Sequence, residues 1–362
     1  MNAEPNEAVI RCEGVWKVFG ARAQDAIRAV KAGELTKTQV RDQLNCVMGV
    51  SDASFSVARG EIFCIMGLSG SGKSTLIRHI NRLIEPSEGA VYIEGRNVNA
   101  MRAKELRQLR AEKIGMVFQN MALMPHRNVR DNVAFALEVR GIPEHKRRAT
   151  ARRAIEAVEL TGWDEKYPDE LSGGMQQRVG LARAIAANPS ILLMDEPFSA
   201  LDPLIRHQLQ GTFMELSAEL QKTTVFITHD LSEAIRIGQR IAIMKDGVLV
   251  QVGTPEEIVT RPADDYVAQF VGGISKLDLV TAAKVMQPLQ KYRQLHGPAD
   301  FAAWPVARPD DKLNTLVDLS IGTDHPIVVK DGDAPVGVVT KDALLRGIQG
   351  RDETSPATGR TE

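Results

Sequence analysis

The sequence has little of what a disulfide-stapled or metal-rich protein needs. It holds three cysteines, Cys12, Cys46 and Cys64, an odd number without the spacing of a metal site. We therefore expect reduced thiols in a reducing compartment, with Cys64, inside an apolar run, as a small core residue. The seven histidines are scattered and lack ligand spacing as well.

Long apolar runs are also missing. None approaches the roughly 20 residues that a membrane-spanning helix needs. The start of the chain, residues 1–7, is polar and acidic, unlike a secretory signal. These features predict a chain that neither spans a membrane nor is exported.

An excess of charge of one sign is absent. The 45 basic and 46 acidic residues are interspersed and leave a net charge of −1. This balance argues against partners such as nucleic acid or an acidic membrane surface. The length of 362 residues and the 43% hydrophobic content predict two or three globular domains.

The most informative segment is a complete phosphate-binding loop pattern, Gly67 to Ser74. It lies between an apolar run, residues 61–66, which predicts a buried strand, and a helical pattern that follows Ser74. A chance glycine-rich turn is the alternative, and the two flanking elements disfavour it. The residues expected to bind nucleotide here are Gly67, Ser69, Gly70, Ser71, Gly72, Lys73, Ser74 and Thr75.

The chemistry of such a loop follows from its backbone. Glycines let the chain curl around an anion, and successive N–H groups together with the helix dipole bind the α- and β-phosphates. Lys73 would reach the β- and γ-phosphate oxygens, and the Ser74 hydroxyl would take one Mg²⁺ position.

A second anion site is predicted farther along the chain. Ser172, Gly173 and Gly174 open a helical pattern that runs through Ala186, so its N-terminus again presents free N–H groups. An ordinary kinase fold needs no such second site.

Two further apolar runs end in chemically active side chains. Residues 191–194 lead into Asp195, which would hold Mg²⁺ through water, and Glu196, which would polarise the attacking water. Residues 224–228 lead into His229. If both runs are strands of one parallel sheet, these side chains meet at the same edge.

These motifs resemble those of ATP-binding cassette (ABC) ATPases. The resemblance covers roughly residues 9–270 and is carried, in order and approximate spacing, by Lys73, Gln119, the signature 171–176, Asp195 with Glu196, Asp202 and His229. Within this superfamily the chain resembles the ATPase subunit of glycine betaine/proline betaine (quaternary amine) importers. The narrower resemblance is carried by residues 66–70, 81–86, 122–126 and 198–206.

The resemblance implies a fold and further site residues. It implies an α/β fold, a P-loop NTPase core with a parallel sheet, an antiparallel β subdomain and a helical subdomain at about 102–170. Residues 21–48 form an insertion in which Thr36 to Gln39 resembles a capping box. Phe19 would stack on adenine, with Trp16 as second candidate and a core aromatic as the alternative.

The resemblance also assigns roles around the γ-phosphate. Gln119 would sense it through Mg²⁺ and water, so Ser74, Gln119 and Asp195 are the expected metal residues. Glu196, His229 and Lys73 are the expected catalytic residues. The signature loop would cap the nucleotide of a second copy, giving a head-to-tail homodimer around ATP. The remaining expected nucleotide-binding residues are Ser172, Gly173, Gly174, Gln176 and Asp202.

Beyond residue 272 the cassette pattern ends. A strand at 325–331, an Asp-Gly turn, a second strand to 340 and a helix at 341–346 follow a helical stretch at 313–319. Together they resemble one CBS unit, although such units usually come in pairs. We expect a cassette at 1–272, a small α+β CBS-like regulatory domain at 273–349 and a disordered tail at 350–362.

The resemblance predicts an ATPase that powers import of a quaternary amine or other compatible solute, such as glycine betaine, proline betaine, choline or proline. The expected partners are a transmembrane permease and, indirectly, a solute-binding protein. The permease would contact an apolar patch, for which a small local core is the alternative; the patch is Met121, Leu123, Met124, Pro125 and His126. The expected location is the cytoplasmic face of the inner membrane. The alternative is a soluble ABC-type ATPase outside transport, which either acts on ribosomes or DNA or is a regulatory protein with the nucleotide as its switch. A single cassette and the lack of an extended heptad pattern disfavour it.

Overall fold

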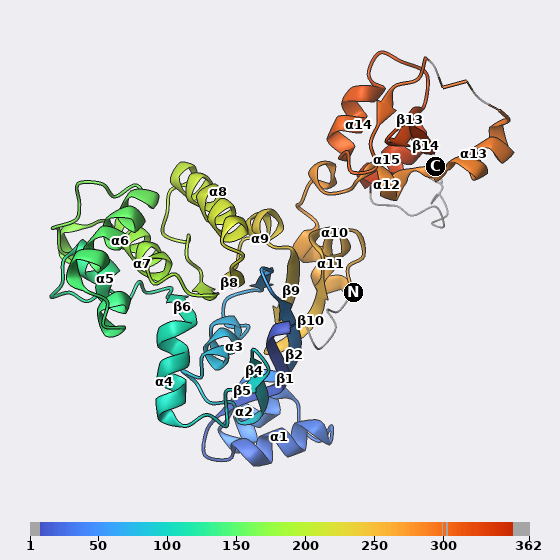
Figure 1. Ribbon diagram of the computed structural model, residues 1–362. Helices are drawn as coiled ribbons and strands as arrows, with labels where there is room; N and C mark the ends of the chain where they lie inside the picture. The colour runs from blue at the N-terminus through green and yellow to red at the C-terminus, as the bar shows by residue number, and fades with distance from the viewer. Residues whose placement is uncertain (1–7, 299, 302, 350–362) are drawn as a thin grey trace. The chain divides into compact units, whose positions relative to one another are not determined.

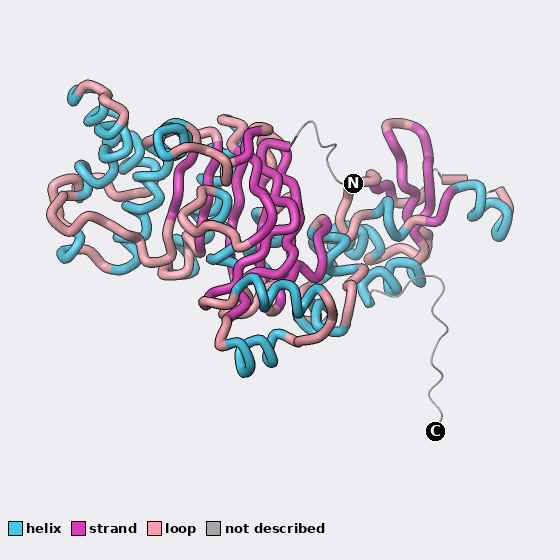
Figure 2. The backbone as a smooth tube through the Cα atoms, turned by 90° about the horizontal axis from the view of Figure 1, so that it is seen from below, coloured by secondary structure: helices cyan, strands magenta, loops and turns pink. Residues whose placement is uncertain are grey.

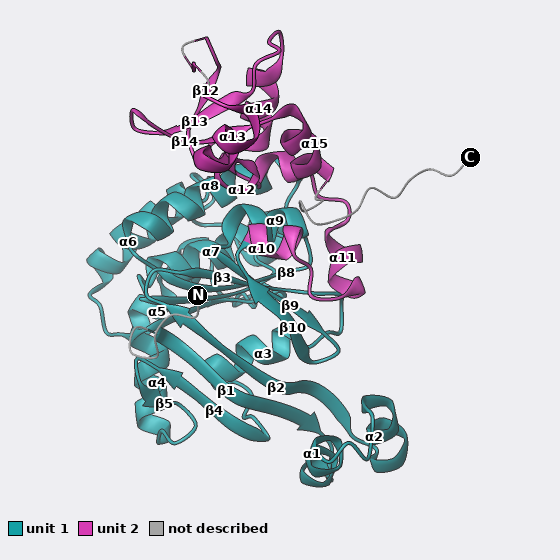
Figure 3. Ribbon diagram, turned by 90° about the vertical axis from the view of Figure 1, so that its right-hand side faces the viewer, with its two compact units in different colours: residues 1–254 teal, residues 255–362 magenta. Residues whose placement is uncertain are grey.

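The computed structural model describes residues 8–349 except 299 and 302. The acidic start and the expected tail at 350–362 lie outside these residues. The chain divides into two compact units, residues 1–254 and 255–362 (Figure 3). The sequence led us to expect a boundary at 272, whereas helices α10 (Pro255–Thr260) and α11 (Asp265–Val271) belong to the second unit.

One sheet of the first unit has four antiparallel strands in the order β2-β1-β4-β5. Their bounds are β1 Ala8–Phe19, β2 Val47–Ala58, β4 Glu88–Ile93 and β5 Arg96–Asn97. Cys12 of β1 lies between Phe55 of β2 and Val91 of β4, with their side chains on the buried face. This sheet is the expected antiparallel β subdomain.

The other sheet of this unit has six strands in the order β10-β9-β3-β8-β7-β6. Neighbouring strands are parallel, except that β10 runs antiparallel to β9. Every residue of β3, β7 and β8 is buried, as expected for strands covered on both faces. The bounds are β3 Ile62–Met66, β6 Ile114–Val117, β7 Ile191–Asp195, β8 Thr223–Thr228, β9 Arg240–Lys245 and β10 Val248–Gly253.

Helices surround these sheets, and α5, α6 and α7 gather on one side of the unit (Figure 1). The helical subdomain expected at about 102–170 takes in α4, α5 and α6, whereas α7 begins after it at Gly173. The helices of the first unit are α1 Ala23–Lys31, α2 Lys37–Leu44, α3 Lys73–Ile80, α4 Ala103–Glu112, α5 Val129–Val139, α6 Glu144–Ala157, the 3-10 turn η1 Pro168–Glu170, α7 Gly173–Ala186, α8 Pro203–Glu219 and α9 Leu231–Ile237.

The main core of the first unit lies between the two sheets and around α3. The rings of Phe55 on β2 and Phe63 on β3 stack with centroids 5.1 Å apart, which joins the antiparallel sheet to the parallel one. Leu76, Ile77 and Ile80 of α3 are fully buried in the same cluster. Figure 2 shows the strands running side by side through this unit with helices outside them. Burial of this apolar face anchors α3 beneath the sheet edge that carries the candidate site.

The insertion has a small core of its own. Ile27 of α1 and Val40 of α2 pack with Trp16 and Val18 of β1 and Met48 of β2. The predicted capping box is confirmed, because Thr36 and Gln39 exchange side-chain and backbone hydrogen bonds. Trp16 is 5% exposed and belongs to this core.

The second unit contains a four-stranded sheet in the order β11-β14-β13-β12. From β12 onward its elements follow the order β-α-β-β-α, and Ala282, Leu316, Val329 and Val339 are among its core residues. The expected hairpin is present, with Gly332 at a φ of +60° in its turn. Besides α10 and α11 the elements are η2 Lys276–Asp278, α12 Ala282–Val285, β11 Gln287–Pro288, α13 Leu289–His296, β12 Val306–Ala307, α14 Leu313–Ser320, β13 Ile327–Asp331, β14 Ala334–Val339 and α15 Lys341–Gln349.

Among the helices in the described ranges, none combines the length and the apolar character that crossing a membrane requires.

Candidate functional site

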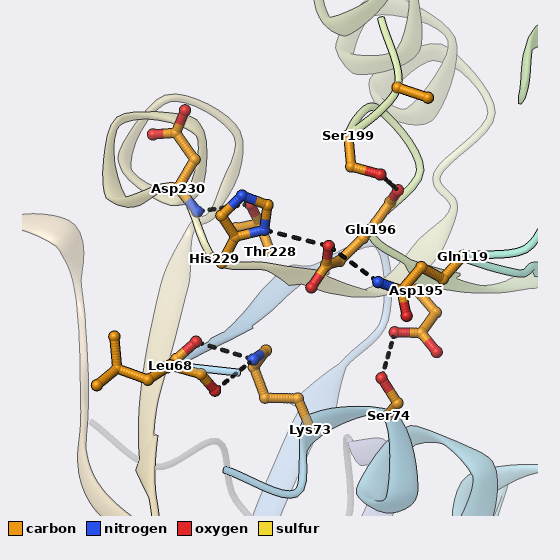
Figure 4. Close-up of polar contacts among 12 residues, drawn as sticks. Leu68, Lys73, Ser74, Gln119, Asp195, Glu196, Ser199, Thr228, His229 and Asp230 are labelled. Carbon is orange, nitrogen blue, oxygen red and sulfur yellow. Dashed lines mark hydrogen bonds and ion pairs between the residues drawn. The ribbon is translucent and has the colours of Figure 1, made fainter. Parts of the chain in front are cut away.

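The site lies where three neighbouring parallel strands of the six-stranded sheet end. The phosphate loop follows β3, Asp195 and Glu196 close β7, and His229 follows β8. The carboxyl edge of a parallel sheet is where ligands bind in open α/β folds. Figure 4 shows these side chains converging on one space. The sequence-based expectation that they share an edge is therefore met.

The phosphate loop depends on glycines at positions that no larger residue fits. Gly67 and Gly72 have φ angles of +153° and +104°. A Cβ on Gly67 would lie 2.1 Å from the Met244 carbonyl oxygen, and one on Gly72 would lie 2.1 Å from that of Gly49. Neighbouring backbone therefore fixes the shape of the loop, and its N–H groups are held in place before an anion arrives.

Lys73 begins α3 and turns its side chain back across the loop. Its ammonium donates hydrogen bonds to the carbonyl oxygens of Gly67, at 2.8 Å, and Leu68, at 3.0 Å (Figure 4). The residue is 5% exposed. Burial lowers the pKa of Lys73, while the nearby carboxylates of Glu196 and Asp195 oppose that shift. A buried ammonium stretched across a cradle of N–H groups provides a charged contact for a phosphate.

Ser74 and Asp195 form a pair of oxygen ligands beside the loop. The Ser74 hydroxyl donates to Asp195 Oδ1 at 2.8 Å, whereas Oδ2 is buried without a hydrogen-bond partner and lies 3.5 Å from the Arg78 guanidinium. Burial raises the pKa of Asp195, and Ser74 and Arg78 oppose that shift. Hydroxyl and carboxylate oxygens suit Mg²⁺, directly or through water, and Oδ2 accepts no hydrogen bond, so these residues fit the ion.

Glu196 is held between two side chains. Its Oε2 lies 3.1 Å from His229 Nδ1 and 3.4 Å from Gln119 Nε2 (Figure 4). Its φ of +48° is rare for a residue with a Cβ, and its backbone N–H donates to the Ile227 carbonyl at 3.0 Å. The turn thus aims a carboxylate, 14% exposed, at the space above the loop. Such a group can orient and deprotonate water.

The signature residues lie at the start of α7. Ser172 caps this helix by accepting a hydrogen bond from the Met175 N–H at 3.3 Å, and Gly173 is exposed. Gln176 points back into its own loop and donates to the Pro168 carbonyl at 2.8 Å. In the described part of the chain, Ser172 and Gln176 make no hydrogen bond to the phosphate loop. The N-terminus of α7 is exposed at Ser172 and Gly173, and its free N–H groups could bind an anion.

Sequence reasoning missed Gln177, the neighbour of Gln176. It is 1% exposed, and its amide donates to the Glu196 carbonyl at 3.0 Å while accepting from the Ala200 N–H at 2.9 Å. Gln177 therefore joins α7 to the chain that leaves Glu196. The sequence does not indicate whether Gln176 or Gln177 faces the protein interior, because the direction of each side chain depends on the residue at which α7 begins.

Two further predicted residues, Asp202 and Phe19, come from other elements. Asp202 caps α8 by accepting from the Ile205 N–H at 3.1 Å, and it is exposed. Phe19, 43% exposed, ends β1, with its ring against Gly49. Gly49 also touches Gly72, so Phe19 lies close to the phosphate loop. The second candidate for adenine stacking, Trp16, is buried in the insertion core and offers no free face.

No group of three or more histidine, cysteine, aspartate or glutamate side chains that could hold a metal exists within the described ranges. The three cysteines are free and buried, and burial raises the thiol pKa of Cys12 and Cys64 above the usual range. At the expected Mg²⁺ site, Ser74 and Asp195 would be joined by Gln119, and nucleotide and water would supply further ligands.

The comparisons with known proteins agree with this geometry. The family model described as ABC transporter matches residues 50–199. The chain is 46% identical over 341 residues to the glycine betaine/proline betaine transport system ATP-binding protein ProV of Salmonella typhimurium, covering 94% of this chain and 82% of that protein. It is 47% identical to the glycine betaine transport ATP-binding protein OpuAA of Bacillus subtilis, covering 82% and 71%. It is also 47% identical to the trimethylamine N-oxide transport system ATP-binding protein TmoW of Pelagibacter ubique, covering 78% and 82%.

Solved structures show the same fold. The dimeric structure of a bacterial ABC transporter cassette matches with a TM-score of 0.59 and 34% identity, covering 68% of this chain and 98% of that one. A dimeric post-hydrolysis cassette bound to ADP and phosphate matches with the same TM-score, 32% identity and the same coverage.

Proposed function

The chain belongs to the ATP-binding proteins of ABC transporters, and from this premise we propose that it hydrolyses ATP to power import of a quaternary amine. The observation that carries the ATPase function is the meeting of Lys73, the Ser74–Asp195 pair and the Gln119–Glu196–His229 group at one sheet edge. The solute class is supported by relatives whose names specify glycine betaine, proline betaine or trimethylamine N-oxide.

The proposed mechanism assigns a task to each side chain. The loop N–H groups and Lys73 bind the phosphates, and Ser74, Asp195 and Gln119 would hold Mg²⁺, which supplies charge neutralisation at the phosphates when bound. Glu196 accepts a proton from the attacking water. His229, 3.1 Å from Glu196, orients that carboxylate and faces the γ-phosphate. Phe19 stacks on adenine.

Closure of the site needs a second copy. Ser172 and Gly173 at the N-terminus of α7 are exposed, and a helix N-terminus with free N–H groups can bind an anion. In a head-to-tail homodimer this N-terminus would cap the γ-phosphate bound by the partner's loop. Dimeric cassette structures among the similar proteins support this arrangement. Hydrolysis would remove the γ-phosphate contact and let the dimer reopen.

We further propose that residues 121–126 contact a separate permease, which would place the chain on the cytoplasmic face of the inner membrane. Met121 and Ala122 have φ angles of +39° and +49°, and their carbonyls each accept a hydrogen bond from Arg183 at 2.8 Å. These two hydrogen bonds fix the conformation of the apolar loop that follows Gln119. A movement of Gln119 on nucleotide binding could therefore be transmitted through this loop to a docked protein. A solute-binding protein would act through the permease.

A role in regulation is proposed for the second unit. Its β-α-β-β-α order supports the CBS-like reading of residues 273–349. A single copy leaves a nucleotide cleft incomplete unless the partner subunit supplies the other half.

The test is the substitution Glu196→Gln, which keeps shape but removes the base. We expect ATPase activity to fall about 100-fold or more while ATP binding persists. In proteoliposomes with the permease, uptake of labelled glycine betaine should stop as well. Wild-type hydrolysis by the variant would refute the role of Glu196. Normal hydrolysis by the unaltered protein without uptake of any quaternary amine would refute the solute class alone.

A further inference from the structure

A buried carboxylate, Glu233, lies behind the turn that carries His229. It belongs to α9, is 8% exposed, and lines the same small pocket as Glu196 and His229. Glutamate is rarely buried unless its oxygens are paired. Glu233 has no role in the proposed mechanism, so the burial of its carboxylate needs a separate explanation.

The partners of Glu233 come from two other elements. Gln210 Nε2 of α8 donates to Glu233 Oε1 at 2.8 Å, and the Thr228 hydroxyl at the end of β8 also hydrogen-bonds to this carboxylate. Burial raises the pKa of Glu233, and these hydrogen bonds oppose the shift. Arg236 in turn donates to Gln210 Oε1 at 3.2 Å. One carboxylate therefore joins β8, α8 and α9.

The same hydroxyl fixes the turn that carries His229. Thr228 Oγ1 accepts a hydrogen bond from the Asp230 N–H at 3.0 Å (Figure 4), so it ties together the two neighbours of His229. The His229 side chain is 60% exposed and has its contact with Glu196 at 3.1 Å. With little packing around the imidazole, its position depends on the backbone of this turn.

We propose that Glu233 is a positioning residue for His229. By holding the Thr228 hydroxyl it sets the turn so that the imidazole reaches Glu196, and through Gln210 it attaches this turn to α8, the helix that Asp202 caps. The inference rests on the proposed function of His229, and the experiment below separates the two.

Removing the carboxylate gives a defined expectation. Glu233→Ala leaves the Thr228 hydroxyl and the Gln210 amide without their shared acceptor and releases the turn. Since a misplacement of about 1 Å can cost about 100-fold in rate, we expect kcat to fall about 10-fold. The phosphate loop is untouched, so the ATP concentration at half-maximal rate should stay within about twofold of the wild-type value.

The decisive measurement is a double-mutant cycle of kcat with His229→Ala. If Glu233 acts through His229, then adding Glu233→Ala to His229→Ala should cost less than about twofold further. The matched control is Glu61→Ala. Glu61 is also 8% exposed and hydrogen-bonded, to the Ala58 N–H, but it precedes β3 at the opposite end of the strand. Its effect on kcat should be small and additive with His229→Ala.

The outcomes are distinct. An undiminished 10-fold loss in the His229→Ala background would overturn the positioning role and leave the function of His229 standing. Wild-type activity of His229→Ala alone would overturn the function of His229 and the inference with it. If Glu233→Ala does not fold, Thr228→Val removes only the linking hydroxyl from a strand position that suits valine. The same non-additivity is then expected, and additive losses would refute the proposal.

Discussion

Lys73→Met tests whether Lys73 binds the ATP of its own subunit, in contrast to Ser172, which is proposed to cap the ATP of the partner subunit. Methionine keeps the unbranched stem of a side chain that is 5% exposed, but it removes the ammonium that donates to the Gly67 and Leu68 carbonyls. A hydrogen bond to a charged group contributes about 1.5–3 kcal/mol. We therefore expect ATP affinity to fall about 10- to 100-fold. Fold stability should change by less than about 1.5 kcal/mol, because volume is conserved and a buried charge is lost.

Binding should be measured by calorimetry in the Glu196→Gln background, so that nucleotide is not consumed. Lys222→Met is the control, since the Lys222 ammonium contacts Asn188 at 2.7 Å, away from the loop, and its loss should leave affinity unchanged. Ser172→Arg should also leave the affinity of the monomer unchanged while blocking dimer closure. Ser172→Ala reports the separate loss of the helix cap, about 1 kcal/mol. Equal losses of affinity in Lys73→Met and Ser172→Arg would refute the division of roles.

Three further predictions concern other parts of the chain. Asp195→Asn should raise the melting temperature of the nucleotide-free protein while abolishing Mg²⁺-dependent hydrolysis, because the folded-state pKa of Asp195 is raised by burial. A raised folded-state pKa means that protonated Asp195 stabilises the fold at acid pH and that this stabilisation is lost as the pH rises through the raised pKa. At pH 7 the wild-type carboxylate is therefore destabilising, and a melting temperature of Asp195→Asn below that of the wild type at pH 7 would contradict this reasoning. In equilibrium binding, Phe19→Ala should weaken ATP affinity about 3- to 10-fold, whereas Phe19→Tyr should keep the wild-type affinity. Equal affinity of the wild type and both variants would exclude stacking. If the second unit gates ATPase activity in response to ionic strength, deleting residues 276–362 should make transport in proteoliposomes constitutive. Transport that stays fully salt-dependent after the deletion would exclude this segment as the salt sensor.

Local motifs made the family, the fold class and the ATPase function predictable. The glycine spacing of the phosphate loop is typical of a single backbone conformation, so it predicts that conformation from the sequence alone. The apolar runs before Asp195 and His229 predict buried strands, and both strands are fully buried. The sequence therefore places both groups at one edge without long-range information.

What the sequence did not reveal depends on contacts between distant segments. Gln177 and Glu233 were missed because their partners lie on other elements, and neither belongs to a pattern whose spacing implies burial. Trp16 was a candidate for adenine stacking, yet it is covered by the helices of the insertion, a packing that no local pattern encodes. The limit at 254 between the units likewise follows from tertiary contacts of α10 and α11 and not from a change in composition.

The central claim is that two copies close around ATP, with the phosphate loop of one and the α7 N-terminus of the other at each nucleotide. It is tested most directly by sedimentation velocity of the Glu196→Gln variant with and without saturating ATP. The account predicts a shift from the 39.7 kDa chain to a species of about twice that mass with ATP, and no shift when Ser172→Arg is added. A Glu196→Gln variant that stays monomeric in saturating ATP, or an ATP-dependent dimer that survives Ser172→Arg, would contradict it.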